Sequence, residues 1–127
     1  MRLRYVVIDD ASFIREIIKA LMSQMGHVCV GEEGDGREAI GIVLRALPDI
    51  VFVDIVLPKK NGLEVIQEIR DHWPQAKIIA ISTLKKEDLQ TDIFRSDNVV
   101  FLQKPFQQND IKMILKSFQF TGAEVDQ

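Results

Sequence analysis

Five short apolar runs alternate along this chain with longer segments that have the apolar periodicity of a helix. The runs cover residues 5–8, 27–30, 50–53, 77–81 and 99–102; the helical segments cover residues 12–25, about 35–47, 63–71, 85–94 and 109–118. Short runs that are apolar on both faces are typical of buried parallel strands. Helices that alternate with such strands cover both faces of a sheet. Right-handed crossovers then favour an α/β fold, a doubly wound (βα)5 sandwich around a five-stranded parallel sheet.

Several residues are predicted to set the ends of these helices. We expect Ser12 to cap the first helix and Gly26 to end it, because a hydroxyl suits an N-cap and glycine a C-terminal turn. Asp35 is expected to cap the second helix. The segment 85–94 is assigned as a helix although its apolar pattern is broken and polar.

Composition restricts the possible functions. The chain has 127 residues, and we expect one domain over residues 1–120 followed by a short polar tail at 121–127. With 16 basic and 19 acidic residues the net charge is −3, which argues against direct nucleic-acid binding. No apolar run approaches a membrane span, so no membrane association is expected. Cys29 cannot form an internal disulfide and no Cys/His cluster suggests zinc, so the expected location is cytoplasmic.

Polar side chains follow four of the five predicted strands. Asp9 and Asp10 follow the first strand, Asp54 the third, Ser82 the fourth and Lys104 the fifth. Each alone has an ordinary explanation, such as a turn residue, a helix cap or a surface lysine. The carboxyl ends of parallel strands share one edge of the sheet, where ligands bind. The joint occurrence therefore predicts a site at this edge.

The residue types at this edge suit phosphoryl transfer. Clustered carboxylate oxygens are ligands that Mg²⁺ prefers. A carboxylate can also act as a nucleophile toward phosphorus and form an aspartyl phosphate. Such a transfer needs alignment and neutralisation of the phosphoryl oxygens, which Mg²⁺, the Lys104 ammonium and the Ser82 hydroxyl or a backbone N–H would supply.

Beyond this chemistry, the sequence resembles the receiver domains of response regulators in two-component signalling, of the kind seen in single-domain chemotaxis regulators. The resemblance extends from residue 4 to about residue 118. It is carried by the motifs at residues 6–10, 34–39, 49–54, 57–58, 61–62, 79–82 and 104–106. It implies a flavodoxin-like sheet with the strand order 2-1-3-4-5.

The resemblance also implies a role for each site residue. Asp54 would be the phosphoacceptor, and Asp9 and Asp10 would hold Mg²⁺ together with Asp54 and the backbone carbonyl of Val56. Lys104 would pair with the phosphoryl oxygens.

Two further residues would form the switch. Ser82 would be the hydroxyl that moves onto the phosphate, and Phe101 would be the aromatic residue that turns inward with it. The domain would be phosphorylated itself, without turning over an external substrate.

The same resemblance implies partners. The helix that begins near Ser12 would dock a histidine kinase or phosphotransfer protein. The face formed by the fourth helix, fifth strand and fifth helix would present the output to a further protein. The chain would be a monomer or a dimer that forms on phosphorylation.

Four positions depart from the commonest family pattern. Asn61 replaces a frequent aspartate, Phe101 a frequent tyrosine, and residues 95–98 a run of small residues. Val56 and Leu84 are apolar where they flank the expected path of attacking water. We therefore hypothesise slow hydrolysis of the aspartyl phosphate; alternatively, both side chains pack against their loops.

Other functions remain as alternatives at this point. A pseudo-receiver that binds partners without phosphorylation would have lost the acidic pair, the acceptor or the lysine, and all are present. A haloacid-dehalogenase-like enzyme would require an Asp-x-Asp motif after the first strand, where Asp9, Asp10 and Ala11 stand. A flavin site would require a hydroxyl- and glycine-rich loop there. The chain is either a complete single-domain regulator or a receiver from a longer protein.

Overall fold

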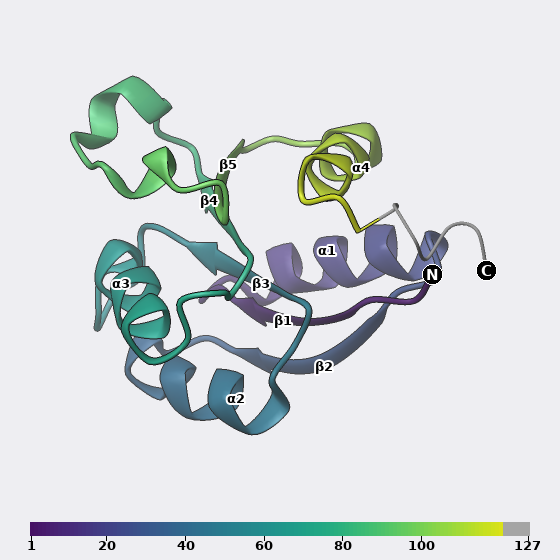
Figure 1. Ribbon diagram of the computed structural model, residues 1–127, viewed down its shortest axis with the longest axis horizontal. Helices are drawn as coiled ribbons and strands as arrows, with labels where there is room; N and C mark the ends of the chain where they lie inside the picture. Colours follow the sequence, from purple (N-terminus) through teal and green to yellow (C-terminus); the bar gives the residue numbers. More distant parts are fainter. Residues whose placement is uncertain (121–127) are drawn as a thin grey trace.

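A five-stranded parallel sheet forms the centre of the computed structural model, which describes residues 1–120 (Figure 1). The strand order is β2-β1-β3-β4-β5, so the predicted order is confirmed. The strands are β1 (Arg4–Ile8), β2 (Val28–Glu33), β3 (Ile50–Asp54), β4 (Ile78–Ser82) and β5 (Val99–Gln103). The expected tail at 121–127 lies outside the described residues, so the domain boundary stays a prediction.

Helices cover both faces of the sheet. One face carries α1 (Ser12–Gln24) and α4 (Gln108–Ser117), and the other carries α2 (Ala39–Ala46) and α3 (Gly62–His72) (Figure 1). Alternate residues of β3 serve the two cores, because successive strand side chains point to opposite faces. Val51 and Val53 belong to the α2–α3 core, whereas Phe52 lies in the α1–α4 core. Packing on both faces holds the strands in place, and with them the residues at their carboxyl ends.

The predicted helix over residues 85–94 is wrong. The segment contains two short 3₁₀ turns, η2 (Lys86–Leu89) and η3 (Ile93–Arg95), and projects from the β4–β5 side of the sheet (Figure 1). Gln90 is left-handed, with φ of 39°, and ends the first turn. The Thr91 hydroxyl then accepts a hydrogen bond from the Ile93 N–H at 3.3 Å. Only Ile93 of η2 and η3 is buried, so too little apolar surface is covered to stabilise a continuous helix.

The predicted helix ends are partly confirmed. Ser12 is not the cap of α1, because Ala11 holds the N-cap position and no side chain caps it. The prediction for Gly26 holds, and the prediction for Asp35 holds only in part. Gly26 follows the end of α1 with φ of +88°, a left-handed conformation that favours glycine. Asp35 accepts a hydrogen bond from the Arg37 N–H, but it caps a short turn, η1 (Gly36–Glu38), that precedes α2.

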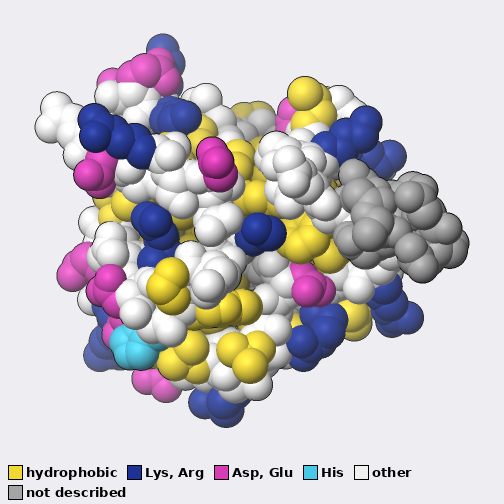
Figure 2. All heavy atoms as spheres, in the orientation of Figure 1, with side chains coloured by type: hydrophobic (Ala, Val, Ile, Leu, Met, Phe, Trp, Pro, Cys, Tyr) yellow, Lys and Arg dark blue, Asp and Glu magenta, His cyan; other side chains and the backbone are white. Residues whose placement is uncertain are grey.

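The described surface carries charges of both signs. On the face shown in Figure 2, lysine and arginine side chains are interspersed with acidic ones, without a continuous basic area. Within residues 1–120, the helices are too short and too polar to cross a membrane. The cytoplasmic location expected from the sequence stays a prediction.

Candidate functional site: an acidic pocket at the carboxyl edge of the sheet

The parallel sheet brings the predicted site residues to one edge. Asp9 directly follows β1, Asp54 ends β3, Ser82 ends β4 and Lys104 directly follows β5. The first three are buried, whereas Asp10 beside them is exposed. Carboxylate oxygens of Asp9, Asp10 and Asp54 lie within 4.8 Å of one another. The convergence predicted from the strand ends is therefore what the fold produces.

Lys104 joins two of these carboxylates. Its Nζ lies 3.1 Å from Asp54 Oδ2 and 3.4 Å from Asp9 Oδ2. The Lys104 N–H donates to the Ser82 carbonyl at 2.8 Å, which ties the chain after β5 to the end of β4. The peptide bond from Lys104 to Pro105 is cis. The ammonium thus lies between two buried carboxyl groups.

The Asp54 carboxylate is held by its own loop. Its Oδ1 accepts a hydrogen bond from the Val56 N–H at 3.0 Å. The start of α3 packs against the same segment, and the Gly62 N–H donates to the Ile55 carbonyl at 2.8 Å. A Cβ on Gly62 would lie 2.1 Å from the Asp54 carbonyl oxygen, so only glycine fits. Asn61 caps α3 by accepting from the Leu63 N–H at 2.7 Å, as expected for its turn position.

Asp9 carries an oxygen that lacks a hydrogen bond. Its Oδ1 accepts from the Ala11 N–H at 2.9 Å, whereas its buried Oδ2 receives no hydrogen bond from residues 1–120. Burial raises the pKa of Asp9 and nearby Asp54 adds to the rise, while the Ala11 N–H and Lys104 lower it. This oxygen has the Lys104 ammonium at 3.4 Å but no hydrogen bond, so a divalent cation would complete its contacts. Three clustered carboxylates are a donor set that suits Mg²⁺. The residues present therefore fit this ion.

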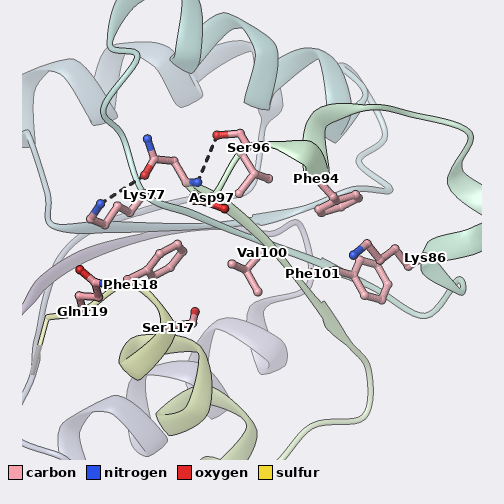
Figure 3. A pocket seen from close by; sticks show the side chains of 12 residues that line it. Lys77, Lys86, Phe94, Ser96, Asp97, Val100, Phe101, Ser117, Phe118 and Gln119 are labelled. Carbon is pink, nitrogen blue, oxygen red and sulfur yellow. Dashed lines mark hydrogen bonds between the residues drawn. The ribbon is translucent and has the colours of Figure 1, made fainter.

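Ser82 and Phe101 lie near the projecting β4–β5 segment. The buried Ser82 Oγ accepts a hydrogen bond from the Leu84 N–H at 2.9 Å. Phe101 is half-buried and packs edge-on against Phe94 of η3, with ring centroids 5.6 Å apart. Figure 3 shows both rings at a pocket beside β5, with Lys86 near them. The aromatic ring of Phe101 thus contacts the segment that replaces the predicted helix.

Val56 and Leu84 are both exposed apolar residues. The Val56 residue is 60% exposed and Leu84 is 46% exposed. This exposure favours the hypothesis of apolar cover over the interpretation that both side chains pack against their loops. They present apolar surface to solvent on the loops that follow Asp54 and Ser82.

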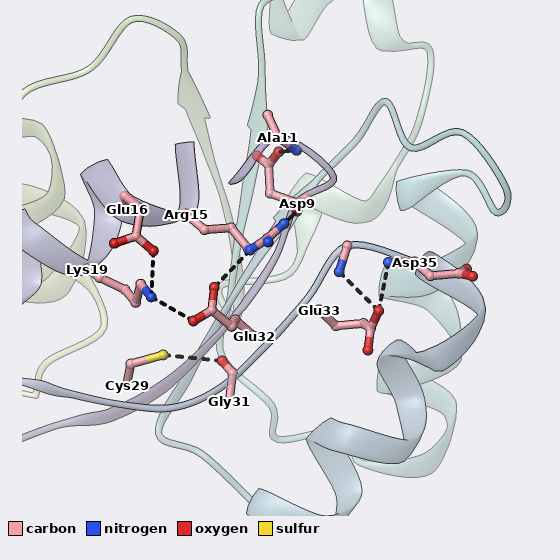
Figure 4. Close-up of polar contacts among 11 residues, drawn as sticks. Asp9, Ala11, Arg15, Glu16, Lys19, Cys29, Gly31, Glu32, Glu33 and Asp35 are labelled. Carbon is pink, nitrogen blue, oxygen red and sulfur yellow. Dashed lines mark hydrogen bonds and ion pairs between the residues drawn. The ribbon is translucent and has the colours of Figure 1, made fainter. Parts of the chain in front are cut away.

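Sequence reasoning missed Arg15. Its Nη1 donates to the Asp9 carbonyl at 2.6 Å, and its Nε pairs with Glu32 at 2.8 Å (Figure 4). One signal could have found it. A basic residue near the amino end of a helix faces the unfavourable end of the helix dipole, which suggests a specific partner.

Known proteins are similar to this chain in sequence and in fold. The chain matches the family model of the response regulator receiver domain over residues 5–116. It is 34% identical over 108 residues to the chemotaxis protein CheY of Thermotoga maritima, covering 85% of this chain and 90% of that protein. It is 32% identical to a protein-glutamate methylesterase/protein-glutamine glutaminase of Pyrococcus abyssi, covering 88% of this chain but 31% of that protein.

Solved structures have the same fold as this chain. The chain is similar to a CheX–CheY–BeF3–Mg complex from Borrelia burgdorferi with a TM-score of 0.82 at 22% identity, covering 91% of this chain and 88% of that one. The receiver domain of AraT from Geobacillus stearothermophilus gives a TM-score of 0.79 at 26% identity, covering 98% and 99%. The chain belongs to the response regulator receiver domain family and is CheY-like.

Proposed function

We propose that this chain accepts a phosphoryl group on Asp54 from a histidine kinase or a phosphotransfer protein, in a reaction that depends on Mg²⁺. The contact of the Lys104 ammonium with both Asp54 and Asp9 supports this proposal most directly. A partly buried cation at the nucleophile suits a transferring phosphoryl group, because transfer depends on neutralising its oxygens.

The metal would be held by carboxylates of Asp9, Asp10 and Asp54 and by the backbone carbonyl of Val56. Two observations support this assignment: the buried Asp9 Oδ2 receives no hydrogen bond from residues 1–120, and the three carboxylates are clustered. When bound, Mg²⁺ supplies positive charge to the phosphoryl oxygens. The Borrelia burgdorferi complex, which contains Mg and BeF3 with a CheY, is consistent with it.

In the proposed reaction, an Asp54 carboxylate oxygen attacks the phosphorus atom of a phosphohistidine. The bond between phosphorus and the imidazole nitrogen breaks, and its electron pair goes to the nitrogen. Lys104 then pairs with the phosphoryl oxygens of the aspartyl phosphate. The Val56 N–H, which already donates to the Asp54 carboxylate, keeps that side chain in place.

Ser82 and Phe101 would report the phosphorylated state. The Ser82 hydroxyl would leave the Leu84 N–H, its present donor, and donate to a phosphoryl oxygen. Phe101 would then leave its edge-on contact with Phe94 and turn inward. Phe101 cannot donate a hydrogen bond to a partner, so its signal would be one of shape alone.

The phosphodonor would dock beside the acidic pocket. Phe13 and Ile17 of α1 are 66% and 43% exposed and line an apolar groove with Pro105 and Phe106. Lys104 lines the same groove, so it connects to the site. The output face would comprise η2, η3, β5 and α4, where a further protein binds.

Intact mass spectrometry tests the proposal. The chain is incubated with Mg²⁺ and a small acyl phosphate, and we expect a gain of one phosphoryl group, about 80 Da. Asp54→Asn should lose the gain, whereas Asp88→Asn, a matched change at an exposed aspartate of η2, should keep it. Equal gain in Asp54→Asn would refute the proposal. A parent that gains no mass and binds no Mg²⁺ would support the phosphorylation-independent binding module.

A further inference from the structure

The Arg15 side chain connects the acidic pocket to the neighbouring strand. Nη1 donates to the carbonyl oxygen of Asp9 at 2.6 Å, and Nε donates to Glu32 Oε1 at 2.8 Å. The second Glu32 oxygen pairs with Lys19 at 2.6 Å, and Lys19 also pairs with Glu16 at 2.7 Å (Figure 4). Glu32 lies on β2, so these ion pairs connect α1 to the sheet. The hydrogen bond to Asp9 connects α1 to the backbone of a pocket residue as well.

The backbone of Asp9 is held on both sides. Its N–H donates to the Glu33 carbonyl at 2.9 Å, and its carbonyl accepts from Arg15. The site has room for this arrangement because residue 34 is glycine. A Cβ on Gly34 would lie 3.3 Å from Arg15 Nη1 and 3.5 Å from the Asp10 Cα. Arg15 therefore restrains the peptide plane that links Asp9 to Asp10.

The position of Asp10 depends on that peptide plane. Its exposed carboxylate makes no hydrogen bond or ion pair with residues 1–120, unlike those of Asp9 and Asp54. We propose that Arg15 is a positioning residue for the divalent cation, because it fixes the backbone from which Asp10 reaches the pocket. This inference rests on the proposed Mg²⁺-dependent function and adds to it a residue that does not touch the metal.

Electrostatics alone predicts the opposite effect. Arg15 is a cation close to an acidic pocket, so its charge opposes the binding of another cation. If charge were all that mattered, Arg15→Met would bind Mg²⁺ more tightly. If positioning dominates, Arg15→Met binds Mg²⁺ more weakly. The sign of the change therefore separates the two explanations.

Calorimetric titration of the whole chain with MgCl₂ measures this sign. We expect Arg15→Met to weaken Mg²⁺ binding about tenfold, the lower end of the effect of residues that orient metal ligands. Arg15→Lys keeps one donor and the charge, and we expect an intermediate affinity. Lys19→Met is the matched control, because Lys19 pairs with the same Glu32 but has no contact with Asp9. Its affinity should equal that of the parent.

Each other outcome overturns the inference. Equal binding by Arg15→Met assigns Arg15 a structural role only, and tighter binding shows that its charge outweighs any positioning. Both results leave the proposed function standing. Equal losses in Arg15→Met and Lys19→Met assign the effect to the ion-pair network as a whole. If Arg15→Met does not fold, the Mg²⁺ affinity of Arg15→Lys is the test. An affinity of Arg15→Lys equal to that of the parent then refutes the inference. A parent that binds no Mg²⁺ overturns both this inference and the metal dependence of the proposed function.

Discussion

Gly62 is the position where one methyl group should disturb the site most. A Cβ there would lie 2.1 Å from the Asp54 carbonyl oxygen and 2.5 Å from the Ile55 Cα. Both are backbone atoms, so the start of α3 must move away from the loop after β3 by about 1 Å in a closely packed interior. Gly41 in α2 is the matched control, because a Cβ there meets only the end of the exposed Arg45 side chain, at 3.3 Å.

The two alanine substitutions should change stability in opposite directions. Gly62→Ala should lower the free energy of unfolding by about 2–3 kcal/mol, since overpacking outweighs the gain in helix propensity. Gly41→Ala should raise it by about 0.5–1 kcal/mol. Urea unfolding measures both changes in the free energy of unfolding, with one m-value fitted to the parent and the two variants. Gly62→Ala should also take up the phosphoryl group more slowly. Stabilisation by both substitutions would refute the close contact of Gly62 with Asp54.

Three further predictions concern other parts of the molecule. Burial lowers the pKa of His27 and the N-terminal charge adds to this, and its Nδ1 accepts from the Leu3 N–H. The folded state therefore favours neutral His27. Its contribution to the free energy of unfolding should be fully present above about pH 6.5 and should decrease below it. Thermal melts at pH 7.5 and 5.5 measure this decrease, which should be smaller in His27→Gln. Val56→Asn combined with Leu84→Glu should release phosphate at least about tenfold faster in a phosphate-release assay, because polar groups position water; equal rates would remove the hypothesis. Asn61→Ala should cost about 1 kcal/mol in urea unfolding through the lost cap of α3, and an unchanged value would contradict that cap.

The fold and the location of the site could be predicted because both follow from apolar patterns that are visible in the sequence. Apolar runs such as 50–53 are buried on both faces, so their identity as parallel strands follows from burial alone. Topology then places whatever follows each strand at one edge. Asp9, Asp54, Ser82 and Lys104 meet there for this reason.

The failures occur where local patterns are weak. The segment 85–94 offers few apolar residues, and its turns depend on the left-handed Gln90 and the Thr91 hydroxyl. The N-cap at Ala11 depends on backbone geometry that Ser12 does not reveal. The position of Arg15 near the amino end of α1 suggests a partner, but its contact with the Asp9 carbonyl depends on how α1 lies against the end of β1.

The site of phosphorylation is the central claim, and reductive trapping tests it directly. Borohydride reduces an aspartyl phosphate to homoserine, which peptide mass mapping locates in the chain. After incubation with Mg²⁺ and an acyl phosphate, we predict homoserine at position 54 and at no other aspartate, with Asp9 and Asp10 unchanged. Homoserine at another position, or a phosphoryl group on a serine or histidine with Asp54 intact, would contradict the assignment of Asp54 as the acceptor.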